Sequence, residues 1–327
     1  MPDISLLAST GNQPVDKILQ GIIGTYELVF PGRIRGYYLL GSYTDATSVS
    51  ISDIDMAILF KGSSVDKREA QVNRCCSLIS PIRLDISAHS EERLPAEDVR
   101  LKLGSVLLYG EDSRDNIALP PIEAYHQYIT AWPCYFFGRI RNIEFLTFPL
   151  DYPEPEGDFY GYDRKSIPAW YPSAIVNGTK ELVASICWTA TAIVALQTGR
   201  YTGRKADGIK AYKELIDDGW ATFVQDVYQR CKLQWKYLVP GDKDDQKLLS
   251  DLCRQTLAFE NHYLTIYRKY LLASLHSESL GDRLFAVRRL REVVYSDEKV
   301  TNSLYALAAA DNEDLREAVK EAIGKIR

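Results

Sequence analysis

Two aspartates separated by a single residue, Asp53 and Asp55, begin an apolar segment that ends at Phe60. Side chains two residues apart point to the same face of a β-strand, so a strand here presents two carboxylates side by side. Because like charges repel and burial disfavours an ionised carboxylate, such a pair among apolar residues needs a compensating cation. Hard divalent cations such as Mg²⁺ take oxygen ligands and usually keep phosphate oxygens among them. The pair therefore indicates a magnesium site for a phosphorylated ligand.

A third aspartate, Asp85, lies in a segment whose pattern also predicts a strand. Residues 83–88 alternate with a period of two, and Asp85 lies on the polar face between Arg83 and Ser87. An isolated aspartate on a strand often only faces solvent. The order of a strand with two acids, a helical segment at 67–79 and a strand with a third acid favours a shared site instead.

These residues resemble the signature of the DNA polymerase β-like nucleotidyltransferase superfamily. In that pattern a glycine–serine turn, here Gly41 and Ser42, is followed after ten residues by the acid pair Asp53-x-Asp55. Asp85, thirty residues after Asp55, matches the third acid on a later strand.

The resemblance implies an α+β fold for a nucleotidyltransferase domain over residues 1–118, with a mixed β-sheet flanked by helices. The stretch 107–112, Leu-Leu-Tyr-Gly-Glu-Asp, also resembles this superfamily. Alternatively, this stretch is the end of an amphipathic helical segment, 94–108, with Gly110 at the C-cap. Turn-forming residues at 115–122 mark the domain boundary. Periodicity predicts, in order, helix 15–30, strand 34–40, strand 53–60, helix 67–79 and strand 83–88.

Residues 119–278 are predicted to form an all-helical domain. The turn at 199–205 resembles the helical domain of aminoglycoside adenylyltransferases of the streptomycin/spectinomycin type. In that family a lysine before the next helix contacts the nucleotide phosphates, and Lys205 is at the matching position, where it would close over the triphosphate. The alternative is a solvated basic turn at a helix C-terminus. The helical segments are 123–148, which Pro133 should break, 179–198, 215–238 and 244–275.

An insertion at 148–172 is rich in proline, glycine, aromatic and acidic residues. A loop this long is either functional or disordered, and its aromatic density argues against disorder. One interpretation is a segment whose aromatic rings pack on the helical domain. The other is a wall of the acceptor site, in which Trp170 stacks on a sugar or base while Asp158 and Asp163 attract cations.

Residues 279–327 are predicted to form a HEAT-like helical tail. The segment 282–294 matches 314–326 at an offset of 32 residues, with apolar residues along one helical stripe. HEAT repeats have a longer period of about 40 residues, so an unrelated helix pair is an equal alternative. One or two such units cannot bury their own faces, so we expect the tail to pack on the helical domain or on a partner.

Composition and charge limit the class of protein. The 327 residues carry a net charge of −5, without the basic balance typical of nucleic-acid-binding proteins. Six scattered cysteines form no Cys-x-x-Cys pair and only four histidines occur, which argues against zinc and favours a reduced, cytoplasmic protein. The chain begins without a signal-peptide pattern, and no uninterrupted apolar run reaches the ~20 residues that a membrane helix needs.

The resemblance implies Mg²⁺-dependent transfer of a nucleoside monophosphate, AMP from ATP or the equivalent group of another NTP, to a hydroxyl, with release of pyrophosphate. Asp53, Asp55 and Asp85 would hold two Mg²⁺ ions, and Asp85 would be a metal ligand, the general base or both. Gly41 and Ser42 would grip the β- and γ-phosphates, because glycine allows close backbone approach and the hydroxyl donates a hydrogen bond.

Three interpretations of the function remain open. The first is an enzyme that adenylylates a small, aminoglycoside-like acceptor, as antibiotic-resistance enzymes do, and the acidic insertion favours it. The second applies the same chemistry to a protein or tRNA, as in toxin-type relatives, with the tail as a docking surface. The third is a nucleotide-binding module without catalytic activity, and the intact set of three acids argues against it.

Overall fold

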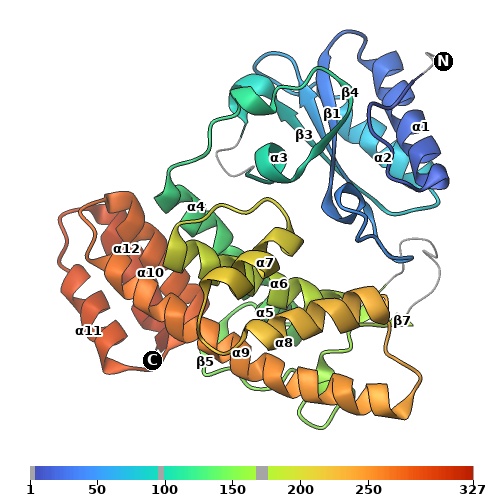
Figure 1. Cartoon of the computed structure of the whole chain (residues 1–327). Helices are drawn as coiled ribbons and strands as arrows, with labels where there is room; N and C mark the ends of the chain where they lie inside the picture. Colours follow the sequence, from blue (N-terminus) through green and yellow to red (C-terminus); the bar gives the residue numbers. More distant parts are fainter. Residues whose placement is uncertain (1–3, 95–98, 167–175, 327) are drawn as a thin grey trace. The chain divides into compact units, whose positions relative to one another are not determined.

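The computed structural model describes residues 4–94, 99–166 and 176–326, and the chain divides into two compact units (Figure 1). Two of the boundaries between the units fall inside helices, α4 (Ile122–Ile129) and α7 (Lys205–Leu215), and the other three lie at 164/165, 176/177 and 199/200. The predicted three-part division at 118 and 278 stays a prediction. We call the units the sheet unit, residues 1–125, 165–176 and 200–208, and the helical unit, residues 126–164, 177–199 and 209–327.

The sheet unit is built on a four-stranded mixed sheet. Its strands are β1 (Ile34–Leu40), β2 (Ile54–Phe60), β3 (Leu84–Ser90) and β4 (Val106–Gly110). They lie in the order β3-β2-β1-β4, with β1 antiparallel to both β2 and β4, and with β2 parallel to β3. Parallel neighbours need a crossover connection, and the segment between β2 and β3 supplies it as a helix. The predicted α+β fold with a mixed sheet flanked by helices is confirmed.

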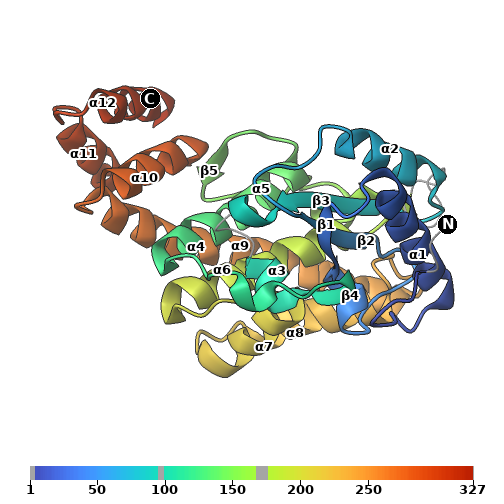
Figure 2. The same ribbon diagram turned by 90° about the horizontal axis from the view of Figure 1, so that it is seen from above.

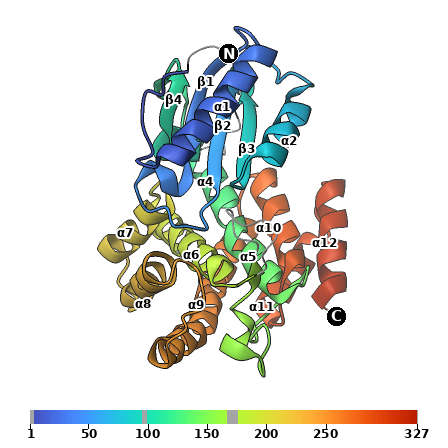
Figure 3. The ribbon, with the colours of Figure 1, turned by 90° about the vertical axis from the view of Figure 1, so that its right-hand side faces the viewer.

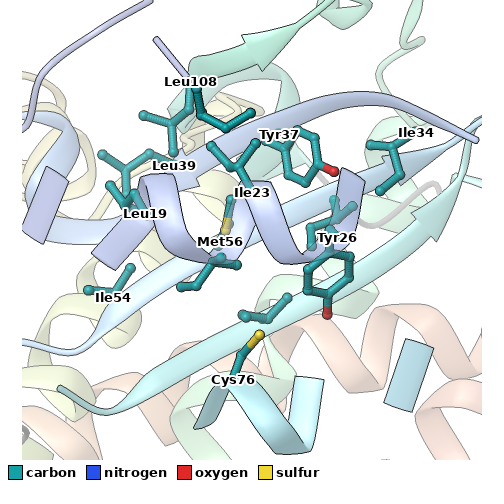
Figure 4. Packing of buried hydrophobic residues seen from close by; sticks show 14 of the residues in the cluster. Leu19, Ile23, Tyr26, Ile34, Tyr37, Leu39, Ile54, Met56, Cys76 and Leu108 are labelled. Carbon is teal, nitrogen blue, oxygen red and sulfur yellow. The ribbon is translucent and has the colours of Figure 1, made fainter. Parts of the chain in front are cut away.

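Two helices, α1 (Gln13–Val29) and α2 (Glu69–Ile79), cover one face of this sheet (Figure 3). Side chains alternate across a strand, so every second strand residue points into the layer beneath these helices. Figure 4 shows Leu19 of α1, Met56 of β2 and Cys76 of α2 in this apolar cluster. The cluster is the main core of the sheet unit and leaves the opposite face for other contacts.

The opposite face is covered by a short helix, α3 (Val99–Gly104). Leu101 of α3 is fully buried and belongs to an apolar cluster that also contains Ala57 and Leu59 of β2. These two strand residues point away from the cluster under α1, whereas Met56 points into it. Asp55 precedes Ala57 by two positions, so it belongs to the face that α3 covers.

The prediction of a helix over 94–108 is wrong in its second half. Within the described part of this segment only α3 is helical, and the residues after it form β4, which pairs with β1. The apolar sequence fits either structure, and the backbone groups along the edge of β1 decide between them because they need hydrogen-bonding partners. Gly110 ends β4 with φ +91° and packs against the backbone of Arg35, so it is not a helix C-cap.

The helical unit is arranged around α6 (Lys180–Thr198), in which every residue from Leu182 to Ala195 is buried. As predicted, the helix ends at Gly199, which adopts the left-handed conformation with φ +67°. Among the described residues, α6 is the one helix long and apolar enough to cross a membrane, and its burial is that of a core helix. It packs against α5 (Ala131–Arg141), α8 (Ala221–Asp226), a π-helical segment (Val227–Gln234) and α9 (Lys243–Leu275).

The predicted helix at 123–148 is divided at Thr130 rather than at Pro133. Pro133 instead lies in the first turn of α5, where its missing N–H costs no intrahelical hydrogen bond. The last residues of the predicted helix form a strand, β5 (Leu146–Phe148), which pairs in parallel with β8 (Val293–Tyr295) near the end of the chain.

The C-terminal tail consists of three helices, α10 (Leu280–Glu292), α11 (Glu298–Leu307) and α12 (Glu313–Ile326). Figure 2 shows them grouped beyond the end of α9. The two segments related by the 32-residue offset are α10 and α12, and they pack against each other. The expected packing of the tail on the helical part of the chain is confirmed, because α10 contacts α9 and β8 pairs with β5. Its HEAT-like character stays a prediction.

A buried ion pair fastens the aromatic insertion to the helical unit. Arg141 Nη2 lies 2.6 Å from Glu260 Oε2, and the two side chains are 6% and 0% exposed. The Tyr162 hydroxyl donates to the same carboxylate oxygen at 2.8 Å, and Arg141 Nε donates to the Asp151 carbonyl at 2.9 Å. Tyr162 and Asp151 belong to the insertion, so this part of it packs on the helical core as the first interpretation expects.

Arg141→Ala should destabilise the helical unit by about 3–5 kcal/mol, because it leaves the Glu260 charge buried without its partner. The control Arg254→Ala removes an exposed arginine that pairs with Asp251, and it should leave stability almost unchanged. Urea unfolding followed by tryptophan fluorescence measures both effects, since four of the five tryptophans belong to the helical unit. Equal unfolding midpoints for the two variants would contradict this role of the buried pair.

Candidate active site

Asp55 and Asp85 are direct neighbours across the parallel strands β2 and β3. They are register partners and each is the second residue of its strand, so their carboxylates lie at the same end of the two strands and on the same face of the sheet. Asp55 is partly buried and Asp85 is exposed. Asp53 lies one residue before β2 begins, on the chain that leads into it. The fold therefore places the three predicted acids at one corner of the sheet.

The glycine–serine turn lies directly on this corner. Leu40, the last residue of β1, is the register partner of Asp55, and Gly41 follows it with φ +70°. A Cβ atom at Gly41 would overlap the Asp55 carboxylate, so only glycine fits both the conformation and the space. Ser42 comes next, in a 3₁₀ turn that ends at Thr44. The structure thus brings Gly41 and Ser42 beside the acids, as the sequence pattern implies.

Burial and neighbouring charges disfavour the ionised form of the Asp55 carboxylate. Burial, followed by the charge of Asp53 and to a lesser degree that of Asp85, raises the pKa of Asp55 to about 6. Two cations, Arg100 and Lys205, oppose this rise in the pKa. The three acids and the two cations therefore form one electrostatic cluster within the sheet unit.

Lys205 belongs to the sheet unit although it lies in the helical half of the sequence. It is the first residue of α7, and the turn before it packs backbone to backbone against the end of α3. A Cβ atom at Gly203 would come within 2.5 Å of the Gly104 nitrogen, so the two glycines permit this approach. The neighbouring Arg204 is occupied by Asp207, 2.9 Å away.

Arg100 of α3 is a site residue that the sequence did not indicate. An arginine in a short amphipathic segment resembles any solvated surface charge, and no motif marks it. Its place beside Asp55 depends on the burial of Leu101 against the sheet, which is a non-local contact.

The carboxylate ligands at this corner of the sheet suit Mg²⁺, although they do not form a complete coordination site. Carboxylate oxygens are the ligands that this ion prefers, and the burial and repulsion that raise the pKa of Asp55 are a cost that a divalent cation relieves. Among the described residues, however, no group of three or more His, Cys, Asp or Glu side chains is positioned to hold a metal ion. The three carboxylates are adjacent without converging on one point.

Two of the predicted acceptor residues, Asp158 and Asp163, line one cavity of about 730 Å³ in the helical unit. The insertion forms one wall with Phe159 and Tyr160, which both have positive φ, and the start of α9 forms the other. Burial, with Asp158 and Glu154 nearby, raises the pKa of Asp163. The third predicted residue, Trp170, lies outside the described residues.

A second cavity of the helical unit, about 800 Å³ in volume, was not indicated by the sequence. The rings of Tyr128, Trp132 and Tyr135 line it, together with Arg139 and Arg289. Both arginines are already paired within the unit, with Glu181 and with Glu292 respectively. The cavity contains none of the residues that the sequence singled out.

Comparison with known proteins gives little further guidance. No protein-family model and no curated protein matches the chain. Among solved structures, the spectinomycin adenyltransferase AAD(9) from Enterococcus faecialis, determined with ATP and spectinomycin, matches with a TM-score of 0.39 and 11% sequence identity. The match covers 76% of this chain and 96% of that one. Similarity at this level supports no conclusion about function. The argument for a function therefore rests on the residues of this chain.

Gly41→Ala should destabilise the sheet unit more than Gly62→Ala does. Both glycines have positive φ, +70° and +83°, so alanine strains each backbone by about 1 kcal/mol. At Gly41 the added Cβ also collides with the Asp55 carboxylate, whereas at Gly62 it meets no atom within 4 Å. Thermal melts by far-UV circular dichroism measure the difference. Equal melting temperatures, with Asp55 unmoved in a crystal structure of the Gly41 variant, would refute the contact.

Asp55→Asn should stabilise the metal-free protein at pH 7.5. The folded pKa of Asp55, about 6, exceeds its ordinary value of 3.8, so folding binds a proton and stability falls as pH rises from 4 to 6. Asparagine removes this penalty, and the gain should be about 1–3 kcal/mol at pH 7.5 and small at pH 4. Urea unfolding with a chelator at both pH values measures it. A gain independent of pH would contradict the shifted pKa.

Proposed function

We propose that this chain is a Mg²⁺-dependent nucleotidyltransferase of the DNA polymerase β-like type. The observation that carries the proposal is the juxtaposition of Gly41 with the Asp55 carboxylate, beside Asp85 on the parallel neighbour strand. A glycine–serine turn packed on paired acids provides backbone and hydroxyl donors for phosphate next to carboxylates for a cation. These are the parts that the sequence pattern names, and they are contiguous in the fold.

The proposed roles of the residues combine the sequence pattern with their positions at the corner of the sheet. Asp53 and Asp55 would hold Mg²⁺, with Asp85 as a further ligand or as the base for the acceptor hydroxyl. When bound, the metal ions would neutralise phosphate charge and polarise the acceptor oxygen. Gly41 would allow close approach of the triphosphate, and Ser42 would donate to its β- or γ-phosphate.

The proposed reaction moves a nucleoside monophosphate, AMP where ATP is the donor. The acceptor oxygen attacks the α-phosphorus and its proton leaves to Asp85 or to water. The new P–O bond forms as the bond between the α-phosphorus and the β-phosphate oxygen breaks. Pyrophosphate departs with that electron pair. Lys205, beside Asp55 in the sheet unit, would hold the triphosphate as a point charge.

We propose a small, cationic, hydroxyl-bearing acceptor of the aminoglycoside kind. The cavity that holds Asp158 and Asp163 offers carboxylates together with the aromatic walls Phe159 and Tyr160, a combination suited to aminated sugars. Two lysines of α9, Lys243 and Lys247, also line the cavity, so its lining carries positive as well as negative charge. A protein or tRNA acceptor, or a nucleotide-binding module without activity, remains the alternative function, and the net charge of −5 disfavours tRNA.

Asp53→Asn and Asp55→Asn should each lower Mg²⁺-dependent pyrophosphate release by at least about 100-fold, the order lost when a charge-stabilising group is removed. The control Asp115→Asn removes an exposed aspartate of the same unit and should leave the rate unchanged. The assay combines labelled NTPs, Mg²⁺ and a panel of aminoglycosides, tRNA and lysate proteins, and the labelled product identifies the acceptor. Retained activity in both variants would refute the metal site, and a wild-type chain that labels nothing would favour the inactive module.

A further inference from the structure

The helix α3 is fixed over the face of the sheet that carries the acids. Leu101 has no exposed surface and lies in one apolar cluster with Leu40 of β1, the register partner of Asp55, and with Ala57, two residues after Asp55 on β2. Figure 1 shows α3 on the side of the sheet away from α1 and α2. Arg100, immediately before Leu101, therefore stands on a helix fixed by core packing, and its charge acts on Asp55.

The far end of α3 is fixed by a second contact. A Cβ atom at Gly104 would lie 2.5 Å from the Gly203 carbonyl oxygen, so the two backbones touch with no room for a side chain. The segment 200–208, which contains Lys205, is thereby held against α3 within the sheet unit. Each of the two segments contributes a cation whose charge acts on Asp55, Arg100 from α3 and Lys205 from the segment 200–208.

Among the described residues, the Arg100 guanidinium interacts with Asp55 through its charge alone. Within residues 4–94, 99–166 and 176–326 it forms no hydrogen bond and no ion pair, although it is partly buried. Two other arginines of the sheet unit are engaged in ion pairs: Arg35 binds Glu91 and Glu111, and Arg114 binds Asp112. A guanidinium has five N–H donors, and partial burial without acceptors is a cost that an anionic ligand would remove.

We propose that Arg100 binds the β- and γ-phosphates of the nucleotide and then the pyrophosphate that leaves. This inference rests on the proposed nucleotidyl transfer and adds a residue that the glycine–serine and aspartate pattern does not contain. A planar guanidinium matches two phosphate oxygens in a bidentate pair, whereas Lys205 supplies a single charge. Negative charge grows on the β-phosphate as its bond to the α-phosphorus breaks, so the guanidinium contact strengthens as the reaction proceeds.

A purely structural role for Arg100 makes a different prediction. If it served only to offset the charge of Asp55, its removal would disturb the whole corner and weaken every nucleotide alike. If it binds the terminal phosphates, its removal weakens ligands that contain them and spares a monophosphate. The number of phosphates in the ligand therefore separates the two roles.

The test is calorimetric titration of the full chain with Mg²⁺-ATP, Mg²⁺-pyrophosphate and AMP, without an acceptor. Arg100→Ala should weaken the binding of ATP and of pyrophosphate by about 10–100-fold and leave AMP binding unchanged. Arg100→Lys should recover only part of the loss, because lysine cannot form the bidentate pair. The matched control Lys102→Ala removes an equal charge from the same helix, where the amine is bonded to the Arg114 carbonyl, and should bind all three ligands like the wild type.

The outcomes separate this inference from the function on which it rests. If the wild-type chain binds ATP and pyrophosphate while Arg100→Ala binds them equally well, the role of Arg100 is refuted and the proposed function stands. Equal weakening of ATP and AMP refutes it in favour of the structural role. A wild-type chain that binds neither ATP nor pyrophosphate overturns both. Arg100→Gln, which keeps the length and polarity of the side chain, replaces Arg100→Ala if the alanine variant does not fold.

Discussion

Repulsion among carboxylates at one corner of a mixed sheet is the constraint on which the rest of this structure depends. Asp55 is partly buried beside Asp53 and Asp85, and its raised pKa records the free-energy cost of that placement. A fold selected for stability alone would place a neutral residue there. The surrounding elements either bring compensating charge to the corner or leave space for it, and this is typical of a binding site rather than of a core.

Close backbone approach is the means by which the fold builds this corner. Gly41 lets the end of β1 lie against the Asp55 carboxylate, and the pair Gly104 and Gly203 lets two distant segments touch. Each contact excludes a side chain, so each leaves room for a ligand or brings a cation closer. Helices α1 and α2 supply the main apolar core on the opposite face, which frees the acid face from carrying most of the stability of the unit.

In the helical unit, different residues of one segment pack on the core and line a cavity. The core of the unit is α6, which is buried from Leu182 to Ala195, and the buried pair of Arg141 and Glu260 anchors the insertion beside α9. Asp158 and Asp163 of the same insertion line a cavity, and they lie within a few residues of Tyr162 along the chain. The two interpretations of the insertion, packing and ligand binding, are therefore compatible, because different residues of one segment do each.

The sequence by itself determined the elements with strong periodicity and the motif they carry. The strand at 34–40, the strand expected at 83–88 and found at 84–90, and the helix ended by Gly199 follow from local spacing. The order of the elements favours a shared site for Asp55 and Asp85, and the parallel register of β2 and β3 makes them neighbours. Only the tertiary structure decided that residues 106–110 form a strand, since that choice depends on the hydrogen-bonding needs of β1. It also decided that Arg100 and Lys205 lie beside Asp55, because backbone contacts between segments about a hundred residues apart leave no periodic pattern in the sequence.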